Sequence, residues 1–257
     1  MGNLTVFTEF LLMDVAGSRE LQVLQGVVFL VIYLGALTGN LVTLTVIMTD
    51  THLHSPMYFF ISNVAVIDLG SISVVVPRAV VNSMTGSKMI SLEECAAQIF
   101  LFTFFAALEF ALLVVMSYDR YVAICHPLHY GLIITPSLCS QAMADSWAFG
   151  LVYSAIHTGC MFRLPFTKTN VIQQYFCDIP QILRISSPDV QYSEFILVFV
   201  GAIVVFGPIA NKPSLKNLLS TMFYTMVPPF MNPIIYCLRN REINAALGRM
   251  FHRFPEI

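Results

Sequence analysis

Charged residues are scarce in this sequence. Of 257 residues only 11% are charged and 57% are hydrophobic, with a mean hydropathy of +0.75, whereas an average soluble protein has about 25% charged residues. Thirteen basic and fifteen acidic side chains cannot cover a soluble protein of this size with polar surface, so lipid must face much of the chain. The net charge of −2 argues against a nucleic-acid partner.

Other features are missing as well. The first twenty residues have neither a basic segment nor a long apolar run, so we predict no cleaved signal peptide. The six cysteines are too scattered for a metal cluster or a disulfide-dense scaffold. His126 and His129 have no nearby Cys or carboxylate to complete a metal site, so we interpret them as loop residues. No nucleophile motif or glycine-rich phosphate loop is present, and the sequence therefore predicts no enzyme.

Long hydrophobic runs dominate what is there. A bilayer core of about 30 Å needs roughly 20 apolar residues of helix. Six runs approach or exceed that length, and they predict an all-α membrane protein with a single domain over 1–257: 23–48, 57–77, 95–118, 138–160, 195–210 and 218–238. The fifth run is slightly short for a span. The last contains Pro228, Pro229 and Pro233, so we expect it to be kinked.

Two segments outside these runs have their own character. Residues 161–194 are polar and contain proline, which predicts a long loop outside the membrane. Residues 239–253 combine spaced apolar side chains with basic ones, which is typical of an amphipathic helix lying on the membrane surface.

Four motifs identify a family. The longest is the string from Met116 to Tyr130, MSYDRYVAICHPLHY, at the end of the third run. The others are LHSPMYFF (53–60), FCDIPQ (176–181) and PPFMNPIIY (228–236). With them the chain resembles the odorant receptors, which are rhodopsin-like G-protein-coupled receptors, over nearly all of its length. The resemblance implies a rhodopsin-like helix bundle in the plasma membrane, a small hydrophobic odorant as ligand and a heterotrimeric G protein as partner.

The resemblance implies a G-protein switch at the cytoplasmic end of the third helix. Asp119 and Arg120 would form an ion pair there, and the guanidinium, once released, would engage the partner. The simpler alternative is a pair of interfacial residues whose charged groups only extend to the membrane surface, where they stay hydrated. The implied switch residues are Asp119, Arg120, Tyr121, Asn232, Pro233 and Tyr236.

Asp68 and Glu109 are carboxylates inside predicted spans, so each should face the bundle and find a cation, a proton or a partner. The resemblance implies that they line a polar core site with Asn40 and Asn232, with a sodium ion as the one candidate cofactor. The alternative is a pair of protonated, hydrogen-bonded acids without an ion.

The resemblance also assigns residues on the outer side. It implies a Cys95–Cys177 disulfide, and it favours a glycosylated Asn3 in the Asn-Leu-Thr acceptor pattern. An odorant pocket should be mostly apolar, and the implied residues are Phe102, Thr103, Ala106, Ile203 and Tyr224. Plain helix packing is the alternative for each of these five side chains.

The resemblance breaks after the fifth run. Family members have seven helices, but here Phe206-Gly-Pro-Ile-Ala210 is followed directly by Asn211-Lys-Pro-Ser-Leu-Lys216, which resembles the outer loop before the seventh helix. The sixth helix is therefore predicted to be missing. An even number of spans would place the basic C-terminal segment outside, against the positive-inside rule, unless the short fifth run fails to span.

Two functions follow as hypotheses. The first is an odorant receptor. The alternative is a signalling-dead receptor, retained in the endoplasmic reticulum or acting only by association with intact receptors, because the family's sixth helix moves to admit the G protein. On that ground we expect no odorant-dependent response from the chain alone. A transporter is disfavoured because no paired broken helices indicate an inverted repeat.

Overall fold

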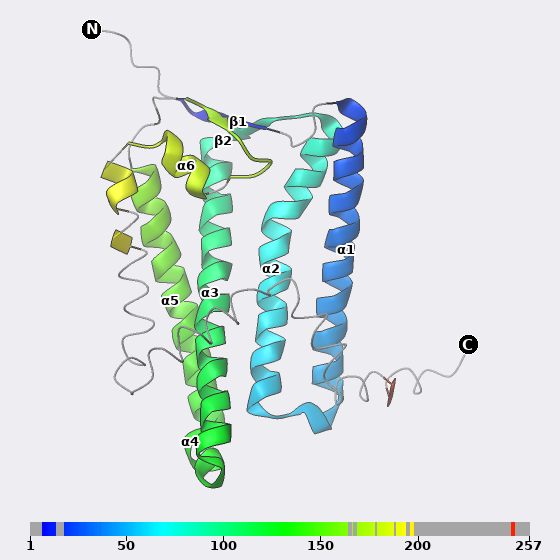
Figure 1. The fold of residues 1–257 in the computed structure, drawn as a ribbon, viewed down its shortest axis with the longest axis vertical. Helices are drawn as coiled ribbons and strands as arrows, with labels where there is room; N and C mark the ends of the chain where they lie inside the picture. Colours follow the sequence, from blue (N-terminus) through cyan, green and yellow to red (C-terminus); the bar gives the residue numbers. More distant parts are fainter. Residues whose placement is uncertain are drawn as a thin grey trace. The chain divides into compact units, whose positions relative to one another are not determined.

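The computed structural model describes residues 7–13, 18–163, 166, 169–177, 179–187, 189–193, 196–197 and 248–249. Helices dominate this part of the chain, as the sequence predicts (Figure 1). In chain order the elements are β1 (Glu9–Leu12), α1 (Arg19–Thr49), η1 (Thr51–Leu53), α2 (Pro56–Thr85), β2 (Met89–Ser91), α3 (Leu92–Cys125), η2 (Pro127–His129), α4 (Tyr130–Ile133), α5 (Pro136–Phe162), β3 (Val171–Ile172) and α6 (Ile179–Ile185).

The first four predicted runs fall within the long helices. Runs 23–48, 57–77 and 95–118 lie in α1, α2 and α3, each long and apolar enough to cross a membrane. Run 138–160 lies in α5, whose 27 residues exceed the roughly 20 that a helix needs to cross a bilayer core. Apart from residues 196–197 and 248–249, the two later runs and the amphipathic segment lie outside the described residues.

The surface of α1 explains why these helices need lipid. Large apolar side chains such as Leu24 (57% exposed) and Val31 (63%) point away from the protein. Hydroxyl groups within the helix bond to their own backbone instead: Thr43 Oγ1 donates to the Gly39 carbonyl at 2.9 Å, and Thr45 Oγ1 donates to the Leu41 carbonyl at 2.8 Å. Such bonds satisfy polar groups where no water is available.

Local sequence fixes where the helices begin and end. Ser91 and Glu94 form a reciprocal capping box at the start of α3, with Ser91 Oγ 3.1 Å from the Glu94 amide and Glu94 Oε2 3.3 Å from the Ser91 amide.

After the end of α2, Gly86 has a φ of +75°, which L side chains rarely adopt. The Gly86 amide donates to the Asn82 carbonyl at 2.8 Å. Arg19 of α1 donates to the carbonyls of Ser83 and Met84, so a cation covers the end of α2.

The described chain divides into two compact units, each treated by itself. The disulfide unit comprises Met1–Leu34, Ser71–Leu108 and Trp147–Pro208, and the switch unit comprises Gly35–Gly70, Glu109–Ser146 and Ile209–Ile257. The long helices run through both.

A three-stranded sheet in the disulfide unit is an addition to the predicted helical fold. Its order is β2-β1-β3, with β1 antiparallel to β2 and parallel to β3. Strands of two to four residues show no clear alternation in sequence, which is why only pairing across the chain reveals them. Phe10 of β1 is fully buried, and its ring meets that of Phe166 edge-on at 5.2 Å.

The two units have separate apolar clusters. In the disulfide unit the sheet covers a cluster that includes Ile99, Met161, Ile172 and Cys177. In the switch unit a smaller cluster joins the end of α1 to the start of α2 through η1, and it contains Val46, Ile47, Leu53, Tyr58 and Ile61.

Candidate ligand pocket and G-protein switch

The predicted switch begins with a buried carboxylate near the end of α3. Asp119 is only 4% exposed, and it accepts a hydrogen bond from the Tyr130 hydroxyl at 2.6 Å. Tyr130 starts α4, so the short helix holds this hydroxyl against α3. Burial, and then the bond to Asp119, raise the pKa of Tyr130, which keeps its hydroxyl a donor.

Arg120 is exposed, unlike its neighbour Asp119. Its guanidinium contacts Met57 Sδ at the start of α2. The described residues contain no ion pair between Asp119 and Arg120. Asp119 accepts the Tyr130 bond instead, and the exposed Arg120 guanidinium makes no bond to a carboxylate. The reason is direction: the two side chains are adjacent on a helix, where neighbours i and i+1 do not face each other.

Of the remaining predicted switch residues, the structure describes only Tyr121. Tyr121 is 45% exposed, and its ring lies 6.5 Å from that of Tyr118 and 5.8 Å from that of His126. Asn232, Pro233 and Tyr236 lie outside the described residues.

The polar core site brings two of its predicted acids near each other within the switch unit. Asp68 and Glu109 are both partly buried and close enough for their charges to interact. Glu109 Oε1 is buried without a hydrogen-bond partner in the described structure. Asn40 is 4% exposed and donates to the Ala36 carbonyl at 3.0 Å, which leaves its amide oxygen as an acceptor. Asn232 lies outside the described residues.

These groups fit a small cation or a proton. Carboxylate and amide oxygens are the ligands that hard cations prefer, and two neighbouring carboxylates need positive charge between them. The described residues contain no group of three or more His, Cys, Asp or Glu that could hold a metal ion, which leaves a site with two carboxylates.

The predicted ligand pocket is represented by one face of α3 in the disulfide unit. Thr103 is buried, and its Oγ1 has no hydrogen-bond partner among the described groups. Phe102 is half-buried and Ala106 is exposed. Ile203 and Tyr224 lie outside the described residues. An unpaired buried hydroxyl beside an aromatic ring could anchor a ligand with a single polar group.

The long loop contributes a ring that the pocket prediction missed. The Phe176 ring lies 6.3 Å from that of Phe102. The signal was present in the sequence, since Phe176 precedes the predicted disulfide cysteine in the FCDIPQ motif. The implied disulfide already brings this loop to α3, but the sequence has no periodicity around Phe176 that would show which way its side chain points.

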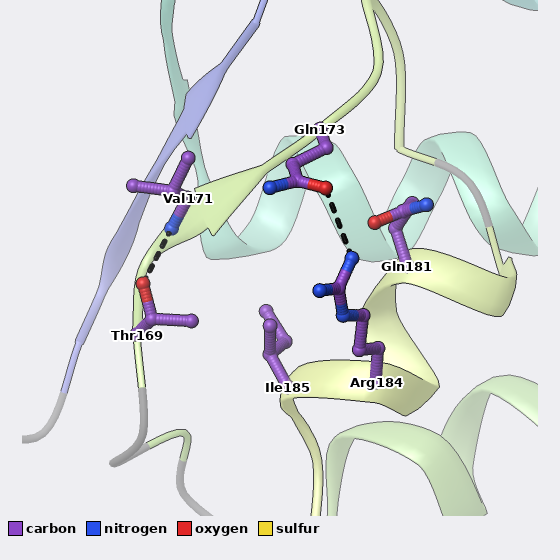
Figure 2. A pocket seen from close by; sticks show the side chains of 6 residues that line it. All are labelled: Thr169, Val171, Gln173, Gln181, Arg184 and Ile185. Carbon is purple, nitrogen blue, oxygen red and sulfur yellow. Dashed lines mark hydrogen bonds between the residues drawn. The ribbon is translucent and has the colours of Figure 1, made fainter.

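A cavity of about 210 Å³ lies elsewhere, within the long loop (Figure 2). Thr169, Val171, Gln173, Gln181, Arg184 and Ile185 line it. Arg184 Nη1 donates to Gln173 Oε1 at 2.9 Å across this cavity. The described members of the predicted pocket, Phe102, Thr103 and Ala106, do not line it. A loop cavity with this polar rim is a poor match for an apolar odorant.

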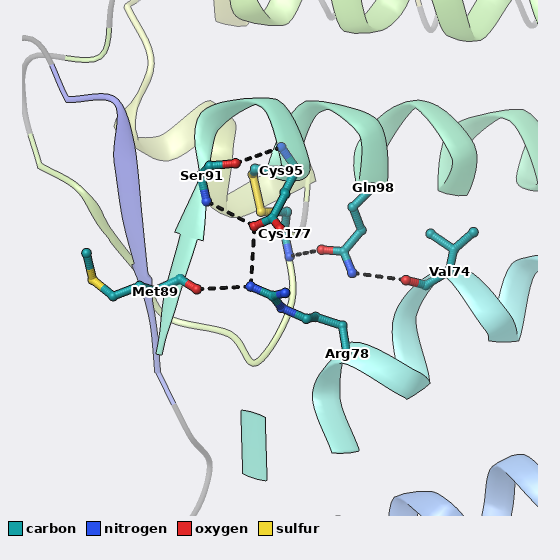
Figure 3. Close-up of a disulfide and its surroundings, with 8 residues drawn as sticks. Val74, Arg78, Met89, Ser91, Cys95, Gln98 and Cys177 are labelled. Carbon is teal, nitrogen blue, oxygen red and sulfur yellow. Dashed lines mark hydrogen bonds and ion pairs between the residues drawn. A yellow bond between two sulfur atoms is a disulfide. The ribbon is translucent and has the colours of Figure 1, made fainter. Parts of the chain in front are cut away.

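The loop is tied to α3 by the disulfide that the resemblance implies. Cys95 and Cys177 are bonded, with Cα atoms 5.5 Å apart, and both are buried. Figure 3 shows the surrounding contacts: Arg78 Nη2 lies 3.2 Å from the Met89 carbonyl, and the same nitrogen pairs with Glu94 Oε2 at 3.3 Å. Disulfides form in the lumenal compartment, so this end of α3 faces outward. Asn3 lies outside the described residues.

The long apolar helices and the disulfide-bonded loop define a multi-pass helical membrane protein. The sequence model for the seven-transmembrane receptors of the rhodopsin family matches residues 39–211. Human olfactory receptor 14I1 is 41% identical, with 98% of this chain and 97% of the relative covered. Human olfactory receptor 14A16 is 35% identical, with 97% of each covered, and mouse olfactory receptor 5B21 is 34% identical, with 99% and 96% covered. The chain therefore belongs to the olfactory receptors of the rhodopsin family.

Membership confirms the broad predictions. The family is one of receptors and not of enzymes, and its members are multi-pass proteins of the plasma membrane.

The alignment with these relatives also tests whether a segment is missing from this chain. The alignment with receptor 14I1 spans 303 positions, which exceeds the 257 residues of this chain by 46, so at least that many positions have no counterpart here. The match to the family model ends at residue 211, beside the junction predicted from the sequence.

Proposed function

We propose that this chain binds a small hydrophobic odorant at the Phe102–Thr103 face of α3 and signals to a heterotrimeric G protein through Arg120. The observation that carries the proposal is the arrangement at the end of α3 in a member of this family. Asp119 is held by Tyr130, and Arg120 is left exposed. A guanidinium that is already free of its neighbouring carboxylate can bond to a protein partner without first breaking an ion pair.

The pocket end supplies the other half of the proposal. Phe102 offers apolar surface, and the Thr103 hydroxyl offers one polar group that is buried and unpaired. A ligand with one oxygen would satisfy that hydroxyl and bury its carbon skeleton against the ring. Small volatile molecules have this composition.

The aligned positions without a counterpart here, at least 46 of them, favour a second candidate, the signalling-dead receptor. A ligand can only shift an equilibrium between states that the protein can reach. If the absent segment is the sixth helix, the active state with an open cytoplasmic cavity is missing, and the pocket loses one wall.

A second-messenger assay over an odorant panel separates the two candidates. Cells expressing the 257-residue chain, with surface expression verified, are compared with cells expressing the Arg120→Ala variant and a form with a family sixth helix inserted between Ala210 and Asn211. An odorant-dependent response of the 257-residue chain that Arg120→Ala abolishes supports the receptor. A response of the inserted form alone contradicts it in favour of the signalling-dead receptor.

We further propose that Asp68 and Glu109 hold a sodium ion, supported by the unpaired Glu109 Oε1. The purified chain should then have a higher thermal midpoint in sodium chloride than in choline chloride, and Asp68→Asn should abolish the difference. Equal midpoints for the unmodified chain in the two salts would favour the protonated pair without an ion.

A further inference from the structure

Gln98 lies in α3 between the disulfide and the proposed ligand face, and both the oxygen and the nitrogen of its side-chain amide form hydrogen bonds. The residue is 7% exposed and follows Cys95 by one helical turn. Its Oε1 accepts a hydrogen bond from the backbone amide of Cys177 at 2.9 Å, and its Nε2 donates to the carbonyl of Val74 at 3.2 Å (Figure 3). One buried amide therefore connects α2, α3 and the long loop.

The bond to α2 is made beside a defect in that helix. Pro77 lies inside α2 and has no N–H, so the Ser73 carbonyl loses its usual helical donor. The Val74 carbonyl is next to this gap. Gln98 donates to this neighbouring carbonyl and not to that of Ser73, so it ties α3 to α2 beside the proline without replacing the lost bond.

The bond to the loop fixes a backbone atom, which the disulfide does not. A disulfide joins two side chains and leaves rotation about several single bonds between each sulfur and its backbone. The hydrogen bond from the Cys177 amide adds a second anchor, one turn away from the first. Together the two anchors set the orientation of the loop backbone immediately after Phe176.

What this backbone presents is a row of aromatic rings. The Phe29 ring of α1 lies 4.9 Å from that of Tyr175, the Tyr175 ring lies 5.0 Å from that of Phe176, and the Phe176 ring lies 6.3 Å from that of Phe102. Centroids at these distances are within the range of favourable ring contact. The row connects the loop with the α3 face that carries Phe102 and Thr103.

We infer that Gln98 is a positioning residue that holds Tyr175 and Phe176 against Phe102 and so sets the loop side of the ligand pocket. The pocket role rests on the proposed receptor function. The tether does not, because it is made of contacts within the chain.

The test is amide hydrogen exchange of the purified chain in lipid nanodiscs, which needs neither an odorant nor a G protein. In Gln98→Leu the Cys177 amide loses its acceptor, and a net hydrogen bond of about 1.4 kcal/mol corresponds to roughly tenfold faster exchange of the peptide containing residues 173–177. Peptides from α5 should be unchanged. Gln98→Glu keeps an oxygen at the same reach and should restore exchange of the loop to within about twofold of the unmodified chain.

Gln25→Leu is the matched control. Gln25 also lies in the disulfide unit, and its buried Nε2 has no hydrogen-bond partner among the described residues, so its loss should leave the loop peptide unchanged. If Gln98→Leu does not accumulate as folded protein, Gln98→Asn replaces it, because its amide is one methylene too short to bridge both partners. Loop exchange that is unaltered in a folded Gln98 variant overturns the inference, and so does equal acceleration by Gln98→Leu and Gln98→Glu.

Discussion

The disulfide unit and the switch unit hold their loops by different kinds of contact. In the disulfide unit a covalent bond, a three-stranded sheet and the buried Gln98 amide all converge on the long loop. The described part of the switch unit has no disulfide and no sheet. A small apolar cluster around Leu53 and the Arg249–Asp50 ion pair hold the connection between α1 and α2. At the end of α3 the contacts are single ones, from Tyr130 to Asp119 and from Arg120 to Met57.

The difference suits a receptor. A pocket that discriminates among small ligands needs walls that keep their places, because one misplaced methylene changes affinity only when its surroundings are rigid. A surface that must rearrange for a protein partner needs contacts that exchange at low cost, and isolated hydrogen bonds contribute only about 1 kcal/mol each. The comparison predicts that equivalent changes in the two units have unequal effects.

The largest effect should come from removing the disulfide. We expect Cys177→Ser to lower stability by about 2–5 kcal/mol, because an 82-residue separation is no longer closed in the unfolded chain. Thermal unfolding followed in detergent measures this loss. Cys125→Ser, an exposed free cysteine in the switch unit, is the control and should change little. Similar losses for the two variants would contradict the proposed difference between the units.

A smaller effect is expected at the switch. Tyr130→Phe removes the hydroxyl that donates to the buried Asp119 carboxylate and should destabilise the fold by about 1–3 kcal/mol, because a buried acceptor loses its partner. Exchange protection should decrease in peptides around 119–130 and stay constant in the disulfide unit. Tyr192→Phe, at a tyrosine that is 70% exposed, serves as the matched control. Protection lost equally in both units would argue against independent behaviour.

The smallest effect concerns the ion pair between Arg249 and Asp50. Arg249 Nη2 lies 2.5 Å from Asp50 Oδ2, and Asp50 Oδ1 also accepts the His52 amide. The Arg249 hydrogen bond, and then the His52 amide, lower the pKa of Asp50 from its ordinary value of 3.8. The stabilisation is therefore complete above pH 3.8 and is lost as pH falls through the lowered folded value.

A double-mutant cycle with Asp50→Asn and Arg249→Gln measures this pair. The coupling between the two substitutions should be small at neutral pH, should weaken in high salt because the pair is exposed, and should vanish in strong acid. Coupling that is the same at neutral and strongly acidic pH would show that the two side chains do not interact as an ion pair.

The sequence by itself determined the membrane-spanning class, the first four helical runs and the family. Apolar runs of about 20 residues have few alternatives, because in lipid a helix satisfies every backbone group within one segment. The Met116–Tyr130 string carried the resemblance to the family, and that resemblance in turn implied the Cys95–Cys177 pairing.

Only the tertiary structure decided which groups meet. The partners of Asp119 and Arg120, the pairing of β1 with β2 and β3, and the two bonds of Gln98 all join segments that are separate in sequence. No periodicity encodes such contacts, because they depend on where helix ends and loops lie in space. The placement of Phe176 against Phe102 is the clearest case. The sequence around it has no periodicity, and the disulfide, the Gln98 bond and the pairing of β3 with β1 give its side chain a direction.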